Sequence, residues 1–527
     1  SGLFINDAQS ATGGSGNSTT LINGGSITLA TSVGVTSDAN PVDLTGDITL
    51  AAGSLLDLRG GGHVLANGTL QTDSKGVPVG QGGNLTLRTY AGIGSPLFAG
   101  KTLARGRLAL AGTIAALGFD GGGTLTLQAP ALRIGGDPAT ATSEEFYFDP
   151  NFWGDAGFAS FVLSAVAQAE VPAGATVRLT HQNLLPDVTA IAAAPTGSDP
   201  AAYAAKGFLT GTQLSPTNLG ISSGLELQSL LHPQGSPNGD AVTLGLGAQI
   251  VADPGASIAL SSVEAVTIQG SIRVPGGSIS LAINYPDSAS GAGAYGPLYI
   301  GPQSVLDVSG VALLDPAPKP VATLGGLVMP RTGKVLSGGT ISLFDDWTPI
   351  LVAPGAVINV SGAADAFDVI QLAPGGLLGG QRQVLVRQPT GGDAGSLKIQ
   401  GWDGLLFEGT LIGQPGAPQA QGGSLAITGD VISSTGLSAS IWLVPDTAAA
   451  VQSAAAKINL ASYVPAVTPY SANEQIDPKL PGGTMLFGVD SLTGSGFSNV
   501  TLVNPKGTIG FAGPVSLMLN GAFSISS

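Results

Sequence analysis

Residues 24–30 read GGSITLA, and close copies of these seven residues recur along the chain. The copies are TGDITLA from Thr45, GGNLTLR from Gly82, GGTLTLQ from Gly122, GGSISLA from Gly276, GGTISLF from Gly338, AGSLKIQ from Ala394 and GGSLAIT from Gly422. Apolar residues alternate with polar ones in this first phrase, as Ile27 and Leu29 do around Thr28. Such alternation after a Gly-Gly pair is typical of a short strand with one buried face. We expect the glycines to turn the chain into each strand through a φ that other residues resist.

A second phrase lies between copies of the first, and in it Pro and Gly precede a short apolar alternation. It reads AAGSLLDLRG from Ala51, GPQSVLDVSG from Gly301 and APGAVINVSG from Ala353, with looser versions from Val171 and Asp253. The alternation points Asp57, Asp307 and Asn359 away from their apolar neighbours. We interpret these three residues as an outward polar face, many repeats apart.

The spacing of the first phrase predicts the architecture. Its second glycine, or the equivalent residue, falls at 25, 46, 83 and 123, at intervals of 21, 37 and 40 residues. Later copies at 277, 339, 395 and 423 are 62, 56 and 28 residues apart. Many intervals lie near small multiples of about 20 residues, which is typical of a solenoid. We therefore predict an all-β fold, a right-handed parallel β-helix.

Two stretches lack the phrases and divide this predicted rod. We expect β-helix rungs over 1–136, 241–430 and 482–527, and partly helical insertions beside the rod over 137–240 and 431–481. In the first insertion, the run FASFVLSAVAQA indicates a short helix from Phe158 to Ala169. In the second, Asp446-Thr447 before an Ala-rich run resembles a helix N-terminus.

Composition excludes several classes of protein. The chain has 527 residues, with 81 Gly and 43% hydrophobic residues, which is too apolar for a disordered linker. A net charge of −15 makes nucleic acid an unfavourable partner. The absence of cysteine excludes disulfides and thiolate metal sites.

No run of 18 apolar residues occurs, so no transmembrane helix is predicted. The first residues, SGLFINDAQS, do not begin with Met and lack the basic and apolar regions of a signal peptide. We therefore expect a mature protein or part of a longer one.

Catalytic motifs occur only in contexts that do not support them. GISSG at 220–224 matches G-x-S-x-G, and GAGAYG at 291–296 matches G-x-G-x-x-G, but neither has the flanking strand and helix that the chemistry needs. The aspartates lack the spacing of calcium motifs, so no metal or cofactor is predicted. A polysaccharide-degrading enzyme on the same fold is an alternative, which would need two or three convergent carboxylates.

The segment from Phe146 to Phe158 is richer in aromatic residues than the composition predicts. We interpret its rings as a small core that docks the first insertion onto the rod. The alternative is a glycan site, in which the rings stack on sugars beside acidic groups. The candidate ligand-binding residues of that site are Tyr147, Phe148, Phe152, Trp153, Glu144 and Glu145.

The alternation of GGSITL with PGAVINVSG resembles the repeat regions of filamentous-haemagglutinin-like exoproteins of bacterial two-partner secretion. The phrases GSLLDLRGGG, SVLDVSG and GGTISLFDDW are of the same kind, and the likeness spans most of the chain outside the two insertions. The family's N-terminal secretion domain and C-terminal modules are not recognisable. The resemblance implies a shaft segment of a secreted cell-surface adhesin, exported through an outer-membrane β-barrel partner. Some relatives bind host glycans and others bind biofilm polysaccharide, and no catalytic residue is implied.

We therefore predict a structural and binding protein, not an enzyme, that is extracellular and binds no nucleic acid. Its expected partners are the outer-membrane β-barrel and a polysaccharide or host glycan. Two alternatives stay open: a β-helical polysaccharide lyase or hydrolase, and a subunit of a homopolymeric extracellular fibre.

Overall fold

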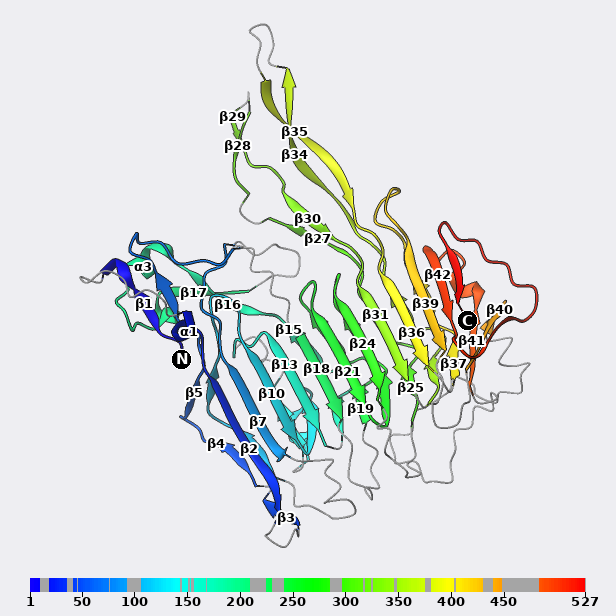
Figure 1. The fold of residues 1–527 in the computed structure, drawn as a ribbon, viewed down its shortest axis with the longest axis horizontal. Helices are drawn as coiled ribbons and strands as arrows, with labels where there is room; N and C mark the ends of the chain where they lie inside the picture. The colour runs from blue at the N-terminus through cyan, green and yellow to red at the C-terminus, as the bar shows by residue number, and fades with distance from the viewer. Residues whose placement is uncertain are drawn as a thin grey trace.

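The chain forms an all-β molecule whose sheets are mostly parallel, as the computed structural model in Figure 1 shows. The structure describes residues 1–9, 19–35, 41–44, 46–74, 76–91, 106–142, 145–149, 152, 156–166, 168–208, 224–229, 241–284, 296–315, 318–323, 326–345, 348–374, 381–401, 404–429, 439–447 and 483–526. The prediction of an all-β chain is confirmed for these residues. None of the helices among them is long and apolar enough to cross a bilayer.

Three sheets hold most of the strands. The first, of thirteen strands, runs in the order β3 (Pro41–Leu44), β2 (Ser26–Val35), β7 (Asn84–Ala91), β10 (Thr124–Ala129), β13 (Ser160–Ala165), β18 (Gly224–Ser229), β21 (Ser257–Ser262), β24 (Ser278–Ile283), β31 (Thr340–Asp345), β36 (Ser396–Gly401), β39 (Gly423–Gly429), β42 (Phe497–Val503) and β44 (Phe523–Ser526). The second, of eleven strands, runs in the order β12 (Glu145–Phe148), β11 (Ala131–Ile134), β14 (Ala169–Val171), β19 (Ala241–Leu244), β22 (Ala265–Ile268), β25 (Leu298–Ile300), β32 (Ile350–Val352), β37 (Gly404–Phe407), β41 (Thr484–Gly488), β40 (Ser440–Val444) and β43 (Thr508–Phe511). The third, of six strands, runs in the order β15 (Thr176–Leu179), β20 (Gln249–Ala252), β23 (Ser271–Arg273), β26 (Val305–Asp307), β33 (Val357–Asn359) and β38 (Thr410–Ile412).

The remaining described elements are two-stranded pairs and helical turns. The two-stranded pairs are β1 (Phe4–Asn6) with β6 (Gly62–Val64), β4 (Ile48–Leu50) with β8 (Leu108–Leu110), β5 (Leu55–Asp57) with β9 (Thr113–Ala115), β16 (Gln182–Pro186) with β17 (Ala204–Phe208), β27 (Val311–Leu314) with β30 (Gly333–Leu336), β28 (Val321–Thr323) with β29 (Gly326–Val328), and β34 (Ala364–Pro374) with β35 (Gln381–Gly391). The helical turns are η1 (Asp7–Gln9), α1 (Thr19–Ile22), η3 (Pro138–Thr140), α3 (Val188–Ala193), η4 (Pro200–Ala202) and η6 (Val489–Leu492).

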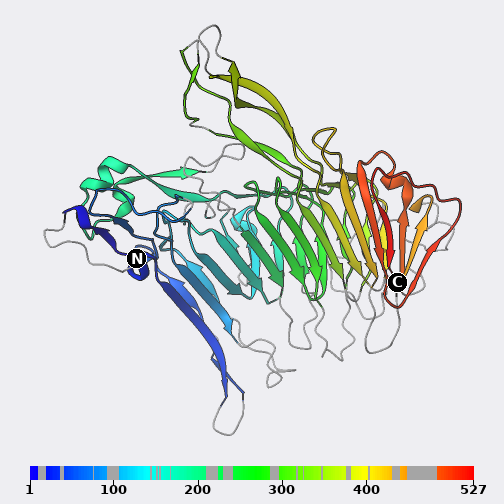
Figure 2. The same cartoon turned by 45° about the horizontal axis from the view of Figure 1, so that its top comes forward.

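Successive strands enter the three sheets in a repeating order. The chain passes from β18 in the first sheet to β19 in the second and β20 in the third, and β21, β22 and β23 repeat this path. Neighbouring strands within a sheet therefore come from successive passes of the chain and pair in parallel, as Leu227 does with Leu260. Figure 2 shows these passes side by side along the molecule. We call the three sheets together the stack.

The core lies between the three sheets and extends along the stack. A single cluster of buried side chains reaches from Ile48 to Leu502. Leu227, Leu260 and Leu281 lie at paired positions on three neighbouring strands and are all buried. Burial of each such leucine stabilises the fold by about 1.5–3 kcal/mol, so each pass of the chain depends on its neighbours for its core.

The glycines of the first phrase are needed because successive passes approach closely at that corner. Gly277, Gly339 and Gly395 precede β24, β31 and β36, and none of them has a positive φ. A Cβ atom at Gly339 would collide with the carbonyl oxygen of Gly277, and one at Gly395 would collide with that of Gly339. The expectation of an unusual φ is therefore wrong for these three glycines, although it holds for Gly276, the first glycine of GGSISLA, which has a φ of 62°. The second phrase also uses one: Gly355 has a φ of 90° in a turn that Ala356 N–H closes on Ala353 O at 3.1 Å.

The prediction of an insertion over 137–240 is wrong for much of that range. β13 pairs in parallel with β10 and β18, and β14 and β15 belong to the other two sheets. The helix predicted from Phe158 to Ala169 is also wrong, because Ser160–Ala165 form the strand β13. Phe161 and Leu163 alternate into the core, and this two-residue period is that of a strand.

Within the same range, described residues 182–208 do leave the stack. β16 and β17 pair in antiparallel fashion and, with α3, lie beside β1 at the N-terminal end of the molecule (Figure 1). The Asn6 side-chain amide donates hydrogen bonds to the carbonyl oxygens of Ala192, at 3.0 Å, and Ala194, at 2.7 Å. Phe4, Leu184 and Ile191 share a buried cluster that is separate from the main core.

The prediction of continuous rungs over 241–430 is also wrong in part. The antiparallel pairs β27–β30, β28–β29 and β34–β35 project from one side of the stack in both views (Figures 1 and 2). We call the described residues of 311–336 and 364–391 the arm. The backbone N–H of Arg331 donates to Asp368 Oδ2 at 2.7 Å and its guanidinium pairs with Asp365, which joins the two segments of the arm.

Of the second predicted insertion, 431–481, the structure describes residues 439–447. Within them β40 belongs to the second sheet, so this part is not an insertion. β41 pairs with β37 on one side and with β40 on the other, so the chain returns after β40 to a position nearer the centre of the sheet. The Ala-rich run expected to be helical lies outside the described residues.

Candidate functional site

The aromatic segment contributes its phenylalanines to the core. β12 pairs in parallel with β11 at the edge of the second sheet. Phe148 is 3% exposed, and its ring meets that of Phe152 edge-on, with centroids 4.9 Å apart. Phe146 and Phe152 pack against the same core cluster. A sugar therefore has no access to the ring of Phe148, and packing energy accounts for its place.

The other candidate residues of this segment face outward or lie outside the described residues. The Tyr147 hydroxyl donates to Gly136 O at 3.1 Å, and Glu145 accepts from Thr142 N–H at 2.6 Å. Burial, followed by the charge of Asp149, raises the pKa of Tyr147. Glu144 and Trp153 are outside the described residues. The structure thus brings Tyr147 and Glu145 to one outer face but separates them from the buried Phe148.

The repeated Asp and Asn of the second phrase act in turns. Asp307 on β26 and Asn359 on β33 are direct partners in the third sheet, so the interpretation that they lie many repeats apart is wrong. The side-chain oxygen of each accepts from a backbone N–H two residues later, at 3.0 Å in both cases. Asp57 makes the equivalent bond, at 3.1 Å, on β5. These contacts explain a short polar residue at this position without a ligand.

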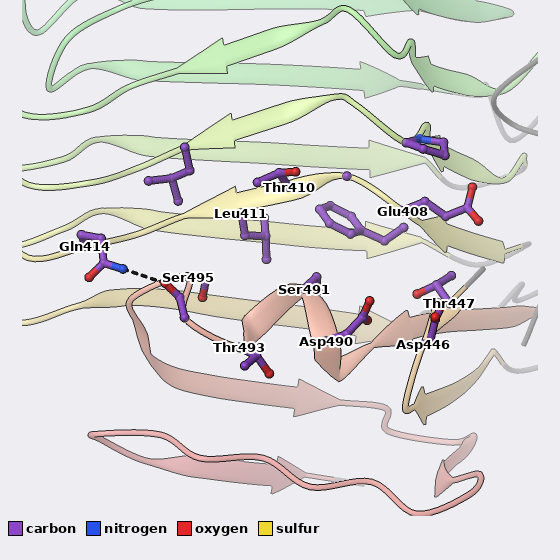
Figure 3. A pocket seen from close by; sticks show the side chains of 15 residues that line it. Glu408, Thr410, Leu411, Gln414, Asp446, Thr447, Asp490, Ser491, Thr493 and Ser495 are labelled. Atoms are coloured by element: carbon purple, nitrogen blue, oxygen red, sulfur yellow. Dashed lines mark hydrogen bonds between the residues drawn. The ribbon is translucent and has the colours of Figure 1, made fainter. Parts of the chain in front are cut away.

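A pocket of about 550 Å³ lies towards the C-terminal end of the stack (Figure 3). The turn between β37 and β38, the segment after β40, and η6 with the turn after it form most of its wall. One end is fixed by the Gln414 side chain, whose Nε2 donates to Gly494 O at 2.7 Å. Its lining residues are Pro354, Phe407, Glu408, Gly409, Thr410, Leu411, Ile412, Gln414, Asp446, Thr447, Asp490, Ser491, Thr493, Gly494 and Ser495.

The charged residues of this lining are the three carboxylates Glu408, Asp446 and Asp490. Burial raises the pKa of Glu408, and the charge of Asp446 raises it further. Burial also raises the pKa of Asp490, against a smaller opposing effect of the Ser491 backbone N–H, and Asp446 again adds to the rise. Asp446 therefore acts electrostatically on both of the other carboxylates.

A buried hydroxyl without a partner lies beside these carboxylates. Thr447 is 3% exposed, and its Oγ1 has no hydrogen-bond partner. A methyl group placed on Gly488 would collide with both Thr447 Oγ1 and Asp490 Oδ1. Two oxygens from separate segments thus converge over a residue that has no side chain. Figure 3 shows Thr447 on the same side of the pocket as Glu408, Asp446 and Asp490.

The chemistry of the pocket is that of a hydrogen-bond acceptor with negative charge. Acidic ligands are repelled, whereas a cation offsets the burial and the charge of Asp446, which raise the pKa values of Glu408 and Asp490. Among the residues that the structure describes, no group of three or more His, Asp or Glu side chains could hold a metal ion. An organic cation or an uncharged polar ligand fits this lining better.

Sequence reasoning missed this pocket for a physical reason. Glu408, Asp446 and Asp490 each stand alone in their own corner of the chain, dozens of residues apart. Thr447 was interpreted only as part of a helix start. Their proximity follows from the strand order β37-β41-β40, in which β41 lies between strands that precede it in the sequence.

Comparisons of the chain with models of protein families, with curated proteins and with solved structures find no match.

Proposed function

We propose that this chain is a shaft segment of a large secreted bacterial surface adhesin or biofilm-matrix protein, similar to filamentous-haemagglutinin-like exoproteins. Its fold is a right-handed parallel β-helix, and its role is structural and binding. It leaves the cell through an outer-membrane β-barrel partner and acts at the cell surface.

The observation that carries this proposal is the repeating path of the chain through three parallel sheets. Each pass pairs with the next in register, as Ile279 does with Ile341, and together they bury one core from Ile48 to Leu502. A molecule built in this way extends by adding passes, because each pass contacts mainly its neighbours. Extension without a change of core suits a shaft that holds a binding surface away from a cell.

One observation favours the alternative of a polysaccharide-degrading enzyme. Glu408 and Asp490 line one pocket and have raised pKa values, which is a property of general acids in glycoside hydrolysis. The adhesin proposal is preferred because the repeated phrases occupy most of the stack and account for its residues structurally.

Incubation with acidic and neutral polysaccharides distinguishes the two functions. The adhesin proposal predicts binding in a pull-down without release of reducing ends or unsaturated products. Turnover that disappears in Glu408→Gln would contradict the proposal and support the enzyme. Electron microscopy of the purified chain tests the third alternative, because ordered polymers would identify a fibre subunit.

A further inference from the structure

We propose that the pocket between β37, β40 and η6 binds a ligand that carries a primary ammonium group beside hydroxyl groups, which is the chemistry of an amino sugar. This inference rests on the proposed binding function and gives it a site and a ligand class.

The charge of the lining selects the ammonium group. Glu408, Asp446 and Asp490 approach the pocket from three separate segments, and the lining residues that the structure describes include no Lys, Arg or His. Carboxylates that repel one another are stabilised by a cation placed among them. A charged hydrogen bond between an ammonium and a carboxylate is also stronger than one between neutral groups.

The uncharged lining selects a ligand with hydroxyl groups. Thr410, Ser491, Thr493 and Gln414 line the pocket with groups that can donate and accept hydrogen bonds. A cavity of about 550 Å³ lies within the range of small-molecule sites. The Ser491, Thr493 and Gln414 side chains already donate to backbone carbonyl oxygens, at 2.7, 3.5 and 2.7 Å. Their oxygen atoms can still accept hydrogen bonds from the hydroxyls of a sugar ring, which a bare alkyl ammonium lacks.

The unpartnered Thr447 hydroxyl is the second, independent observation. A buried hydroxyl without a hydrogen bond destabilises a protein, and no residue that the structure describes at this corner is a partner for it. Its Oγ1 lies beside Asp490 Oδ1 over Gly488, where both atoms can reach one ligand group. A bound hydroxyl or ammonium would supply the missing partner.

Isothermal titration calorimetry of the full chain with glucosamine tests the inference, with glucose, N-acetylglucosamine, spermidine and CaCl2 as comparison probes. Glucosamine should bind at least tenfold more tightly than glucose or N-acetylglucosamine, which lack the ammonium. Equal affinities for these three sugars would overturn the role of the carboxylates. Spermidine binding as tightly as glucosamine would overturn the role of the hydroxyls, and tighter binding of Ca²⁺ would overturn the ligand class.

Substitutions of lining residues test whether glucosamine binds in this pocket. Glu408→Gln should lower the affinity for glucosamine about ten- to a hundred-fold, since a charged hydrogen bond is lost. The matched control, Glu226→Gln on the outer face of β18, should bind as the unmodified chain does. Thr447→Val should weaken binding at least threefold with an unchanged or higher Tm. A Tm decrease with unchanged affinity would identify Thr447 as structural and overturn its assigned role.

Proton release gives a readout that a surface site would not produce. Binding of a cation lowers the pKa values of Glu408 and Asp490, so titrations at several pH values from 4 to 7, in buffers of different ionisation enthalpy, should show protons released where these groups titrate. Affinity should rise with pH across this range. Proton release that is absent at every pH in the range would overturn the site. Binding without product formation agrees with the adhesin proposal, whereas binding followed by turnover would contradict that proposal and leave the ligand site in place.

Discussion

Strand β13 and strand β34 of the hairpin β34–β35 both carry several large apolar residues, yet these side chains have opposite environments. Leu163 on β13 is fully buried, whereas Ile370 and Leu372 on β34 are 52% and 61% exposed. β13 pairs in parallel with a strand on each side, and each of those strands comes from another pass of the chain. Among the strands that the structure describes, β34 pairs only with the one that follows it, over all of Ala364–Pro374. A strand becomes core here because of its neighbours in space, and local composition does not decide it.

The largest effect is expected from Phe148→Ala in β12, at the edge of the stack. It should lower the free energy of unfolding by about 3–5 kcal/mol, because a buried ring and its edge-on contact with Phe152 are lost. The matched change Tyr147→Ala should lower it by about 1 kcal/mol, for the loss of one hydrogen bond. Urea denaturation measures both. If Phe148→Ala lowered the free energy of unfolding no more than Tyr147→Ala, the Phe148 ring would contribute no more to stability than a side chain on the outer face of β12.

A pair of leucines compares the stack and the arm directly. Leu163→Ala should lower the free energy of unfolding by about 3 kcal/mol, through lost burial and a residual cavity. Leu372→Ala, in the exposed arm, should change it by less than about 0.5 kcal/mol. Thermal denaturation followed by circular dichroism measures both variants. An equal Tm decrease in the two would contradict the distinction.

The alternation around Leu163 shows how much of the fold was predictable. An all-β chain with parallel passes followed from the period of two and the spacing of the phrases, because these are properties of consecutive residues. The place of β13 did not follow, since its segment lacks a Gly-Gly pair and its apolar run resembles a helix. Its pairing with β10 and β18 requires strands dozens of residues away. The acidic pocket escaped prediction for the same reason.

The corner where the chain leaves the stack for the N-terminal end is sensitive to pH. His181 N–H donates to Asp253 Oδ2 at 2.7 Å, and burial raises the pKa of Asp253 to about 6. The folded protein therefore binds this proton more tightly than the unfolded chain, so the contribution of Asp253 to stability is full below about pH 4 and lost as the pH rises through 6. Burial lowers the pKa of His181, so its contribution has the opposite sign and is lost as the pH falls below 6.5.

Asp253→Asn separates the two contributions. The variant should be more stable than the unmodified chain by about 2 kcal/mol at pH 7, and the advantage should disappear near pH 4. The free energy of unfolding of this variant should still fall between pH 7 and pH 5, because the stabilising contribution of neutral His181 is lost on acidification. Urea denaturation at several pH values provides the measurement, and an advantage that grows on acidification would refute the assignment.

A small effect is expected even from removal of the whole hairpin of the arm. The N–H of Gly392 donates to Ala363 O at 2.8 Å, so the chain is already closed at the base of β34–β35. Replacing residues 365–390 with an Asn-Gly turn should lower the free energy of unfolding of the stack by about 1 kcal/mol or less. The far-ultraviolet circular dichroism should keep its strand signal. Loss of cooperative unfolding would show that the arm supports the stack.

The sequence by itself determined most of the strands that carry the repeated phrases, because alternation over three to six residues is enough to specify which side chains can be buried together. It also determined the glycine positions, although the reason for them appeared only when successive passes were stacked and the carbonyl of Gly277 was found where a side chain at Gly339 would lie. Tertiary structure alone decided which segments leave the stack and which acidic residues meet. Both depend on pairing between passes that are distant in the chain, and no local pattern of residues records that pairing.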